Sequence, residues 1–522
     1  MKNCMVILCM LVFCVQAHAM LKLDSIFVDK QERGNESETA PEPYCGYSLV
    51  HPIIANWDTY SWLEKRNYQA FFQNVLATYR YNTATVDGKI LIYFSPQYYS
   101  NPDNIKNIIN QLSAIENRFD HFGMELKRPG MSVPYKIIVY VVPLNIPSSV
   151  IPLAGELLGD SYKGIPVVVI NGNKLDYLQS NPCILSHAYA HSLLFSTRAT
   201  HSLWFMEAVS AWMESAVNTK CENIEPFYTY RLEHPEIPIG AMDANVAIGD
   251  SNFIKLLNSK SDGIIFRVLN ERNRPGAILE RLNDALMVST NRTLADYFEE
   301  YALINFYEAL RSTSISSSSI TSIPSISTFS LNQLSVNYAE LSSASAESIR
   351  LLFDSEKKNF KIWVFVMEPE LKFYISSLNL ASSKPADIIL PHESTSRVHM
   401  VIINSALVPD SISMQASTIY DYPFKLDSFE VSVGTKQVKL DWVTLRETET
   451  LGWIIYRKDE KDPTFRKINE LLIPAVGNSN DPTHYVYVDK DVRPHSSYQY
   501  YIEVITKNLF PKKGPITSVK LP

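Results

Sequence analysis

The sequence predicts a multidomain protein in which an α+β domain is followed by two all-β sandwich domains. Its 522 residues exceed what one hydrophobic core of ordinary size holds. Helix-like and strand-like patterns alternate across residues 47–311, and a run of Ser, Thr and Ile typical of linkers follows at 312–330. Beyond it, short strand-like runs separated by turn residues continue to the C-terminus, which indicates β-sandwiches at 331–421 and 422–522.

The N-terminus has the features of a secretory signal peptide at residues 1–19. Lys2 is positively charged, the apolar run Met5–Val15 follows, and Ala-His-Ala at 17–19 offers small residues for cleavage. We therefore expect a protein that is secreted, periplasmic or at the cell surface, with an uncleaved N-terminal anchor as the alternative. No later stretch reaches about 18 apolar residues, so no transmembrane segment is expected after cleavage. Residues 20–46 are polar and predict a loose leader.

The composition indicates folded domains and excludes one class of partner. Hydrophobic residues make up 46% of the chain and charged residues 20%, as in globular rather than disordered proteins. The formal net charge is -7 and no long run of Lys and Arg occurs. Nucleic acid is therefore not an expected partner.

The first domain is expected to place strands ahead of a group of helices. β-Branched and apolar runs predict the strands, and apolar residues at helical spacing predict the helices. The predicted strands are 89–94, 135–142 and 165–170, and the predicted helices are 101–123, a helix from about 182, 204–217, and further helices to about 310.

The pattern of the C-terminal part predicts two sets of short strands. The first set is 349–353, 360–367, 372–375, 387–390 and 398–404, and the second is 438–442, 452–457, 465–468, 485–489 and 497–504. The order of the second set resembles a fibronectin type III domain, with Trp442 as the core aromatic residue and Tyr498 or Tyr500 in the tyrosine-corner role. Because such domains carry no chemistry of their own, the function must be sought earlier in the chain.

The segment that carries chemistry is Ser-His-Ala-Tyr-Ala-His at 186–191. His187 and His191 are four residues apart, so a helix places both imidazoles on one face, as zinc requires of two ligands from one helix. A second helix from Trp204 offers Glu207 as a third ligand. Glu214, two turns further on, is expected to hydrogen-bond one of the ligands.

These two segments resemble the HExxH helix and the following W-x-x-E-G-x-A helix of gluzincin-type zinc metallopeptidases. The resemblance spans about residues 80–310 and implies a zincin fold for the α+β domain. It also implies zinc as the cofactor, with His187, His191 and Glu207 as its ligands, and a cleft that takes a peptide or protein.

The sequence departs from this family at the residue that performs the catalysis. The position after the first histidine holds Ala188, where the family has the Glu that activates the zinc-bound water. Alanine has no titratable group, and losing a general base costs roughly 10²–10⁴-fold in rate. Ala208 in place of Gly in the second motif is a mild change, because alanine suits a helix.

Several other side chains near the motif are secondary candidates. His201 is a further candidate ligand, although a role at a loop surface is favoured, and Tyr189 is expected to pack. Tyr228 and Tyr230 are candidates for the border of a cleft, with packing favoured for both. After signal cleavage three cysteines remain, which permits one disulfide and one free thiol. The first expectation is a pair between the two that flank the motif, namely Cys183 and Cys221, which leaves Cys45.

Three functions follow as alternatives. The first is a pseudopeptidase that retains zinc and binds a peptide or protein without cleaving it. The second is an active zinc peptidase, with an acid from elsewhere replacing Ala188, or a form of one inactivated by a Glu-to-Ala substitution. The third is a surface adhesion or assembly protein that acts through its β-sandwiches. We expect the first, because the ligand residues are kept while the general base is absent.

Overall fold

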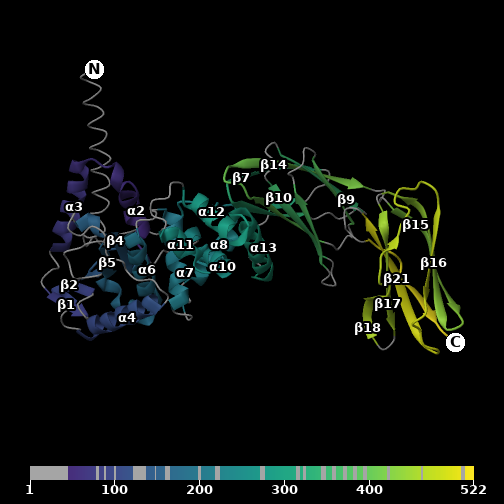
Figure 1. Ribbon diagram of the computed structural model, residues 1–522, viewed down its shortest axis with the longest axis horizontal. Coiled ribbons are helices and arrows are strands. Elements are labelled where there is room, and N and C mark those ends of the chain that lie inside the picture. The colour runs from purple at the N-terminus through teal and green to yellow at the C-terminus, as the bar shows by residue number, and fades with distance from the viewer. Residues whose placement is uncertain are drawn as a thin grey trace, which may run out of the picture. The chain divides into compact units, whose positions relative to one another are not determined.

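The computed structural model forms two compact units, residues 1–314 and 315–522 (Figure 1). The predicted signal peptide and most of the predicted leader lie outside the described residues. The structure describes residues 45–77, 82–86, 90–98, 102–121, 137–146, 148–158, 165–197, 202–217, 221, 224–270, 277–312, 318–320, 325–341, 348–355, 360–367, 373–379, 385–391, 397–419, 424–448, 450–459, 462–506 and 512–522.

A five-stranded sheet forms the first part of the first unit, in the order β1-β2-β3-β5-β4. Its strands are β1 (Asn82–Val86), β2 (Ile90–Phe94), β3 (Ile137–Val142), β4 (Val150–Ala154) and β5 (Pro166–Asn171). β2, β3 and β5 are parallel, whereas β4 runs antiparallel to β5 at the edge. Every residue of β3 and β5 is buried, which explains their uninterrupted Val and Ile runs. The three strands predicted from the sequence are confirmed within a few residues.

Helices make up the rest of the first unit. They are α2 (Tyr47–Ala55), α3 (Trp62–Ala77), α4 (Pro102–His121), α5 (Leu175–Ser180), α6 (Cys183–Thr197), α7 (Leu203–Val217), α8 (Glu225–Glu233), α9 (Ala244–Gly249), α10 (Ser251–Lys260), α11 (Ile264–Asn270), α12 (Ile278–Thr290) and α13 (Leu294–Ser312). Among the described residues, no helix combines the length and apolar character needed to cross a membrane.

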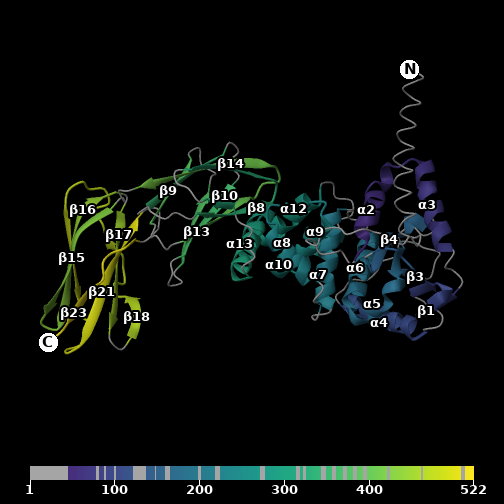
Figure 2. The same cartoon turned by 180° about the vertical axis from the view of Figure 1, so that it is seen from behind.

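Helix α6 lies between the sheet and helix α7. It packs against β4 and β5 on one side and against α7 on the other, as the two opposite views show (Figures 1 and 2). Every residue from 183 to 195 is buried, and so is every residue of α7 from 203 to 214. Both helices are apolar on all sides, as expected for helices inside a domain. The polar side chains that they carry are therefore removed from water.

A buried ion pair fixes the beginning of α7. The Asp250 carboxylate, between α9 and α10, accepts hydrogen bonds from Arg231 Nε at 2.8 Å, Trp204 Nε1 at 2.9 Å and Tyr301 OH at 3.1 Å. These side chains come from α8, α7 and α13, and all of them are buried. Because Trp204 lies one turn before Glu207, this cluster also sets the position of the predicted third ligand.

The second unit begins with a β-sandwich whose sheets have the orders β11-β10-β13-β8-β6 and β12-β9-β14-β7. Its strands are β6 (Ser318–Ile320), β7 (Ser325–Leu331), β8 (Ser335–Leu341), β9 (Ser348–Asp354), β10 (Phe360–Met367), β11 (Phe373–Asn379), β12 (Ala386–Pro391), β13 (Arg397–Asn404) and β14 (Asp410–Ile419). All five strands predicted here are confirmed. Alternate residues of β10 point into the shared apolar core, which gives the period of two seen in the sequence.

The Ser- and Thr-rich stretch 312–330 is a linker only in part, which corrects the prediction made from its composition. Within it, β6 pairs with β8, and β7 pairs with β14. The reason is that Phe329 and Leu331 alternate on one face of β7 and are buried in the core, while Thr328 and Ser330 are exposed. Two buried apolar residues at the right spacing are enough to hold a strand whose other positions are Ser and Thr, apart from the exposed Ile326.

The last β-sandwich contains the three-stranded sheet β15-β16-β20 and a second sheet in which β17 pairs with β18, β19 and β21, and β21 also pairs with β22 and β23. Its strands are β15 (Phe424–Gly434), β16 (Gln437–Glu447), β17 (Thr450–Asp459), β18 (Asp462–Lys467), β19 (Ile473–Pro474), β20 (Thr483–Asp489), β21 (Ser497–Thr506), β22 (Lys512–Lys513) and β23 (Thr517–Lys520). Trp442 is fully buried in the core, as predicted. Of the two tyrosines considered for the corner, Tyr498 accepts the backbone N–H of Arg493 at 2.9 Å, which is the expected contact.

Candidate metal centre

Two adjacent helices bring four of the predicted site residues together. Helix α6 carries His187 and His191 one turn apart, and α7 carries Glu207 and Glu214 two turns apart. All four side chains are fully buried, with 0% exposure. Because the two helices pack against each other, the histidines of one face the carboxylates of the other.

Three donor atoms converge on one point. His187 Nε2 and His191 Nε2 are 3.0 Å apart, and Glu207 Oε2 lies 3.1 Å from the first and 3.3 Å from the second. A tetrahedral zinc ion with bonds of about 2.0–2.1 Å holds its nitrogen and oxygen ligands about 3.3 Å from one another. The triangle formed by these atoms therefore has close to the size that a bound zinc ion requires.

Cys45 joins this cluster, which the sequence did not indicate. Its thiol belongs to the same group of candidate ligands as His187, His191 and Glu207, whose donor atoms all lie within 4.8 Å of one another. The residue is fully buried and lies two positions before the first residue of α2, within the stretch that the sequence predicts to be a leader. The sequence offers one clue to this role: Cys45 is the cysteine that stays unpaired when Cys183 and Cys221 form a disulfide.

Burial and neighbouring charges set the protonation of the metal-free cluster. Burial, assisted by the Glu207 carboxylate, raises the pKa of the Cys45 thiol to about 11. Burial disfavours the charged form of Glu207 too, but His191 and His187 outweigh it and lower the pKa of this carboxyl to about 2. Burial lowers the pKa of His191. For His187, burial is outweighed by Cys45 and by the two carboxylates, so its pKa rises well above the ordinary value.

Without a metal, these shifts favour a buried ion pair between His187 and Glu207. Metal binding displaces the protons on the ligand atoms, because imidazole and thiol coordinate in their deprotonated forms. Two atoms of the cluster have no hydrogen-bond partner within the described residues, namely Glu207 Oε1 and His191 Nδ1. Within the described residues, part of the hydrogen-bonding capacity of these buried side chains is therefore not used.

The contact that we expected of Glu214 is present around His187. Glu214 Oε2 lies 3.1 Å from His187 Nδ1, on the opposite side of the ring from the convergent donors. A carboxylate in this position accepts a hydrogen bond from Nδ1–H and so leaves Nε2 as the metal-binding atom, an arrangement common around metal-bound histidines.

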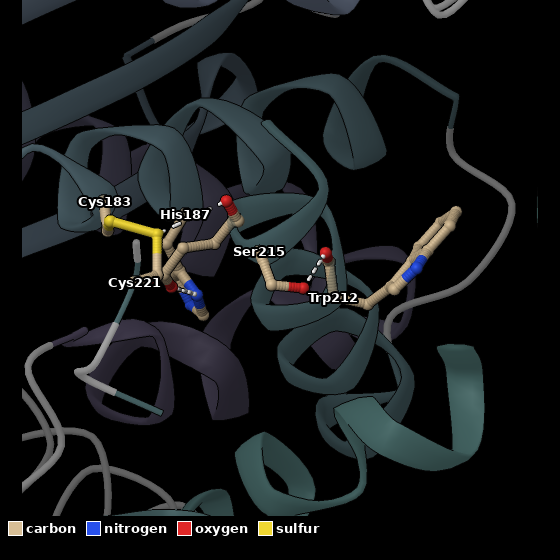
Figure 3. Close-up of a disulfide and its surroundings, with 6 residues drawn as sticks. Cys183, His187, Trp212, Ser215 and Cys221 are labelled. Carbon is tan, nitrogen blue, oxygen red and sulfur yellow. Dashed lines mark hydrogen bonds and ion pairs between the residues drawn. A yellow bond between two sulfur atoms is a disulfide. The ribbon is translucent and has the colours of Figure 1, made fainter. Parts of the chain in front are cut away.

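A disulfide links the beginning of α6 to the chain just after the end of α7. Cys183, the first residue of α6, is bonded to Cys221, which follows α7, with an S–S distance of 2.08 Å (Figure 3). The expected pairing is confirmed. Because Cys183 lies one turn before His187, the bond ties the beginning of one ligand-bearing helix to the chain beyond the other. It therefore limits how far the two helices can separate.

The remaining sequence candidates lie away from the donor atoms or outside the described residues. Ala188 is buried and supplies no polar atom. Tyr189 stacks on Phe119 with ring centroids 5.2 Å apart, so its role is packing. Tyr228 OH donates to Asn305 at 3.5 Å, and Tyr230 lies against His234. His201 lies outside the described residues.

Tyr47 is a further neighbour of the cluster that the sequence did not single out. Its ring centroid lies 4.8 Å from that of His191, and its buried hydroxyl has no hydrogen-bond partner within the described residues. Burial, followed by the charges of Glu207 and Cys45, raises the pKa of this hydroxyl well above its ordinary value. Tyr47 is two residues from Cys45 in the chain, so the beginning of α2 encloses this side of the cluster.

Comparisons with known proteins do not assign this chain to a family. No protein-family model matches it, and no curated protein matches it. Among solved structures it is similar to pectate lyase PelI from Erwinia chrysanthemi in complex with tetragalacturonic acid, at 17% identity over 18% of this chain and 28% of that chain, with a TM-score of 0.15. This chain thus spans less than a third of that protein.

Two further solved structures show likeness of the same low degree. One is described as a myokine, at 14% identity over 19% of this chain and 98% of that chain, with a TM-score of 0.16. The other contains the FN1–FN3 domains of chicken CNTN1, at 12% identity over 31% of this chain and 57% of that chain, with a TM-score of 0.16. Scores of this size carry no argument about function, which must come from the site itself.

Proposed function

We propose that this chain is an exported metallopeptidase-like protein that holds one zinc ion and binds a peptide or protein without cleaving it. The convergence of His187 Nε2, His191 Nε2 and Glu207 Oε2 at 3.0–3.3 Å carries the proposal. The donor set supports zinc in particular, since imidazole and carboxylate are ligands that zinc prefers in tetrahedral sites. The outer contact from Glu214 to His187 adds support.

The alanine at position 188, where the family that this segment resembles has its general base, supports a non-catalytic role. A bound zinc ion supplies Lewis-acid charge and lowers the pKa of a coordinated water. A peptidase then needs a group that takes and returns the proton of that water, and Ala188 has none. The carboxylates that contact the histidines, Glu207 and Glu214, are engaged with the ring nitrogens. Neither is left over to replace the absent glutamate.

Two further features support export and a binding role. The disulfide between Cys183 and Cys221 is the kind of bond that persists in secreted and envelope compartments. The two β-sandwiches, the second resembling a fibronectin type III domain, are of the type that spaces or attaches domains at cell surfaces. We propose that they display the first unit to its peptide or protein partner.

The test is the zinc content of the mature protein, purified without added metal, together with an assay of peptide hydrolysis. We expect about one zinc per chain in the wild type and almost none in His187→Ala, because that change removes a ligand. His234→Ala is the matched control, since His234 is an exposed histidine of the same unit and should leave the zinc content unchanged. The zinc-loaded wild type should leave a mixture of unstructured peptides uncut.

Each part of this test can contradict the proposal separately. Wild-type protein without zinc, even after incubation with the metal, would remove the zinc site. Zinc-dependent cleavage of the peptides by the wild type would replace the pseudopeptidase with an active enzyme.

A further inference from the structure

The three donors of the proposed zinc site leave one corner of a tetrahedron to be filled. Catalytic zinc sites keep that corner for water or substrate, whereas structural sites fill it with a fourth protein ligand. Which of the two applies here depends on what lies beside His187, His191 and Glu207. The structure places a single thiol there, that of Cys45.

The surroundings of Cys45 Sγ are those of a ligand rather than of a packed thiol. Its sulfur lies within 4.8 Å of each of the three donor atoms. Thiolate is a preferred zinc ligand. A Cys side chain in plain apolar packing has none of these polar neighbours.

The backbone holds Cys45 in this place independently of any metal. Cys45 forms a parallel bridge with Val150 on the free edge of β4, and Gly46 N–H donates to Val150 O at 2.7 Å. The approach is close, because a Cβ on Gly46 would lie 2.9 Å from Ile151 Cγ1. The segment before α2 thus covers the edge of the sheet beside α6 and directs its cysteine at the histidines.

We infer that Cys45 is the fourth ligand and that it closes the site, so that the metal coordinates Cys, His, His and Glu with no position open to water. This inference rests on the zinc site proposed above and narrows it to a structural one. It gives a second reason, separate from Ala188, why the centre does not hydrolyse peptides: restoring a base at position 188 would act on no bound water. It also accounts for the odd cysteine, since two of the three form a disulfide and the third binds metal.

The test replaces the bound metal with cobalt(II) in the full-length mature protein and records its absorption spectrum. Sulfur ligation adds a thiolate-to-cobalt charge-transfer band in the near ultraviolet that nitrogen and oxygen ligands do not produce. We expect this band in the wild type and its loss in Cys45→Ser. The zinc affinity of Cys45→Ser should fall by more than about 100-fold, the upper loss seen when only an outer partner of a ligand is removed.

Two controls keep the result independent of folding and of the other cysteines. Cys183→Ser/Cys221→Ser should retain the charge-transfer band, because it removes the two sulfur atoms of the disulfide and leaves the Cys45 thiol. Circular dichroism of Cys45→Ser shows whether that variant is folded, and the wild-type spectrum is decisive even if it is not.

The outcomes separate this inference from the zinc site on which it rests. Cobalt bound at one per chain without the charge-transfer band would overturn Cys45 as a ligand and leave the three-ligand site standing. No cobalt or zinc bound by the wild type would overturn the zinc site itself, and the inference with it.

Discussion

Removal of the metal by a chelator is expected to lower the thermal midpoint of the first unit by on the order of 10 °C. The reason is that metal binding to the folded state alone stabilises it, by about 4 kcal/mol when free zinc is 1,000-fold above its dissociation constant. In a domain of this size each kcal/mol shifts the midpoint by about 2–4 °C. Within the part of the chain that the structure describes, Glu207 Oε1 and His191 Nδ1 of the metal-free cluster also have no hydrogen-bond partner.

Differential scanning calorimetry of the full chain measures this shift, and the transition of the second unit serves as an internal reference. The second unit has separate apolar cores, so its transition should stay in place when zinc is removed. Glu207→Ala is the second control, because a protein that holds no zinc has none to lose and its midpoint should not respond to the chelator. Equal midpoints for the zinc-loaded and chelated wild type would contradict a metal with a structural role.

Asp250→Ala is expected to destabilise the first unit by about 3–5 kcal/mol. The change leaves the guanidinium of Arg231 buried without its carboxylate, and breaking a buried ion pair from one side costs this much. Trp204 Nε1 and Tyr301 OH lose their acceptor at the same time. Because Trp204 lies one turn before Glu207, we also expect weaker zinc binding, although Asp250 is not a ligand.

Calorimetry of the zinc-loaded variant, followed by a zinc titration, tests both parts of this prediction. Asp262→Ala is the matched control: Asp262 is an exposed carboxylate of the same helical region, and its removal should change stability by less than about 0.5 kcal/mol. A loss of 1 kcal/mol or less for Asp250→Ala would show that the cluster does not hold α7 in place.

Regular periodicity made much of the fold predictable. The helix at 101–123 appears as α4 (Pro102–His121), and all five strands predicted at the C-terminal end appear, because apolar residues repeat there at the spacing of the element. What could not be predicted depends on contacts far apart in the sequence. Helix α2 contains Pro52, and β7 is mostly Ser and Thr, so neither has a clear local signal.

In the candidate site too, the residues with a local sequence signal were predictable and the residue without one was not. His187 and His191 lie in one helix, and Glu207 and Glu214 in the next, so spacing and a family resemblance were enough to select them. Cys45 is 142 residues from His187 in the chain and comes from a segment with no periodicity of its own. Its place depends on pairing with the edge strand β4, which no local pattern specifies. The residue that closes the site is therefore the one that sequence reasoning left unassigned.

X-ray absorption at the zinc edge of the mature wild-type protein tests the central claim most directly. We expect a four-coordinate zinc with one sulfur at about 2.3 Å and three nitrogen or oxygen neighbours at about 2.0–2.1 Å. Cys45→Ser should lose the sulfur neighbour alone. A zinc surrounded by five or six nitrogen and oxygen atoms with no sulfur, or a protein that takes up no zinc at all, would contradict it.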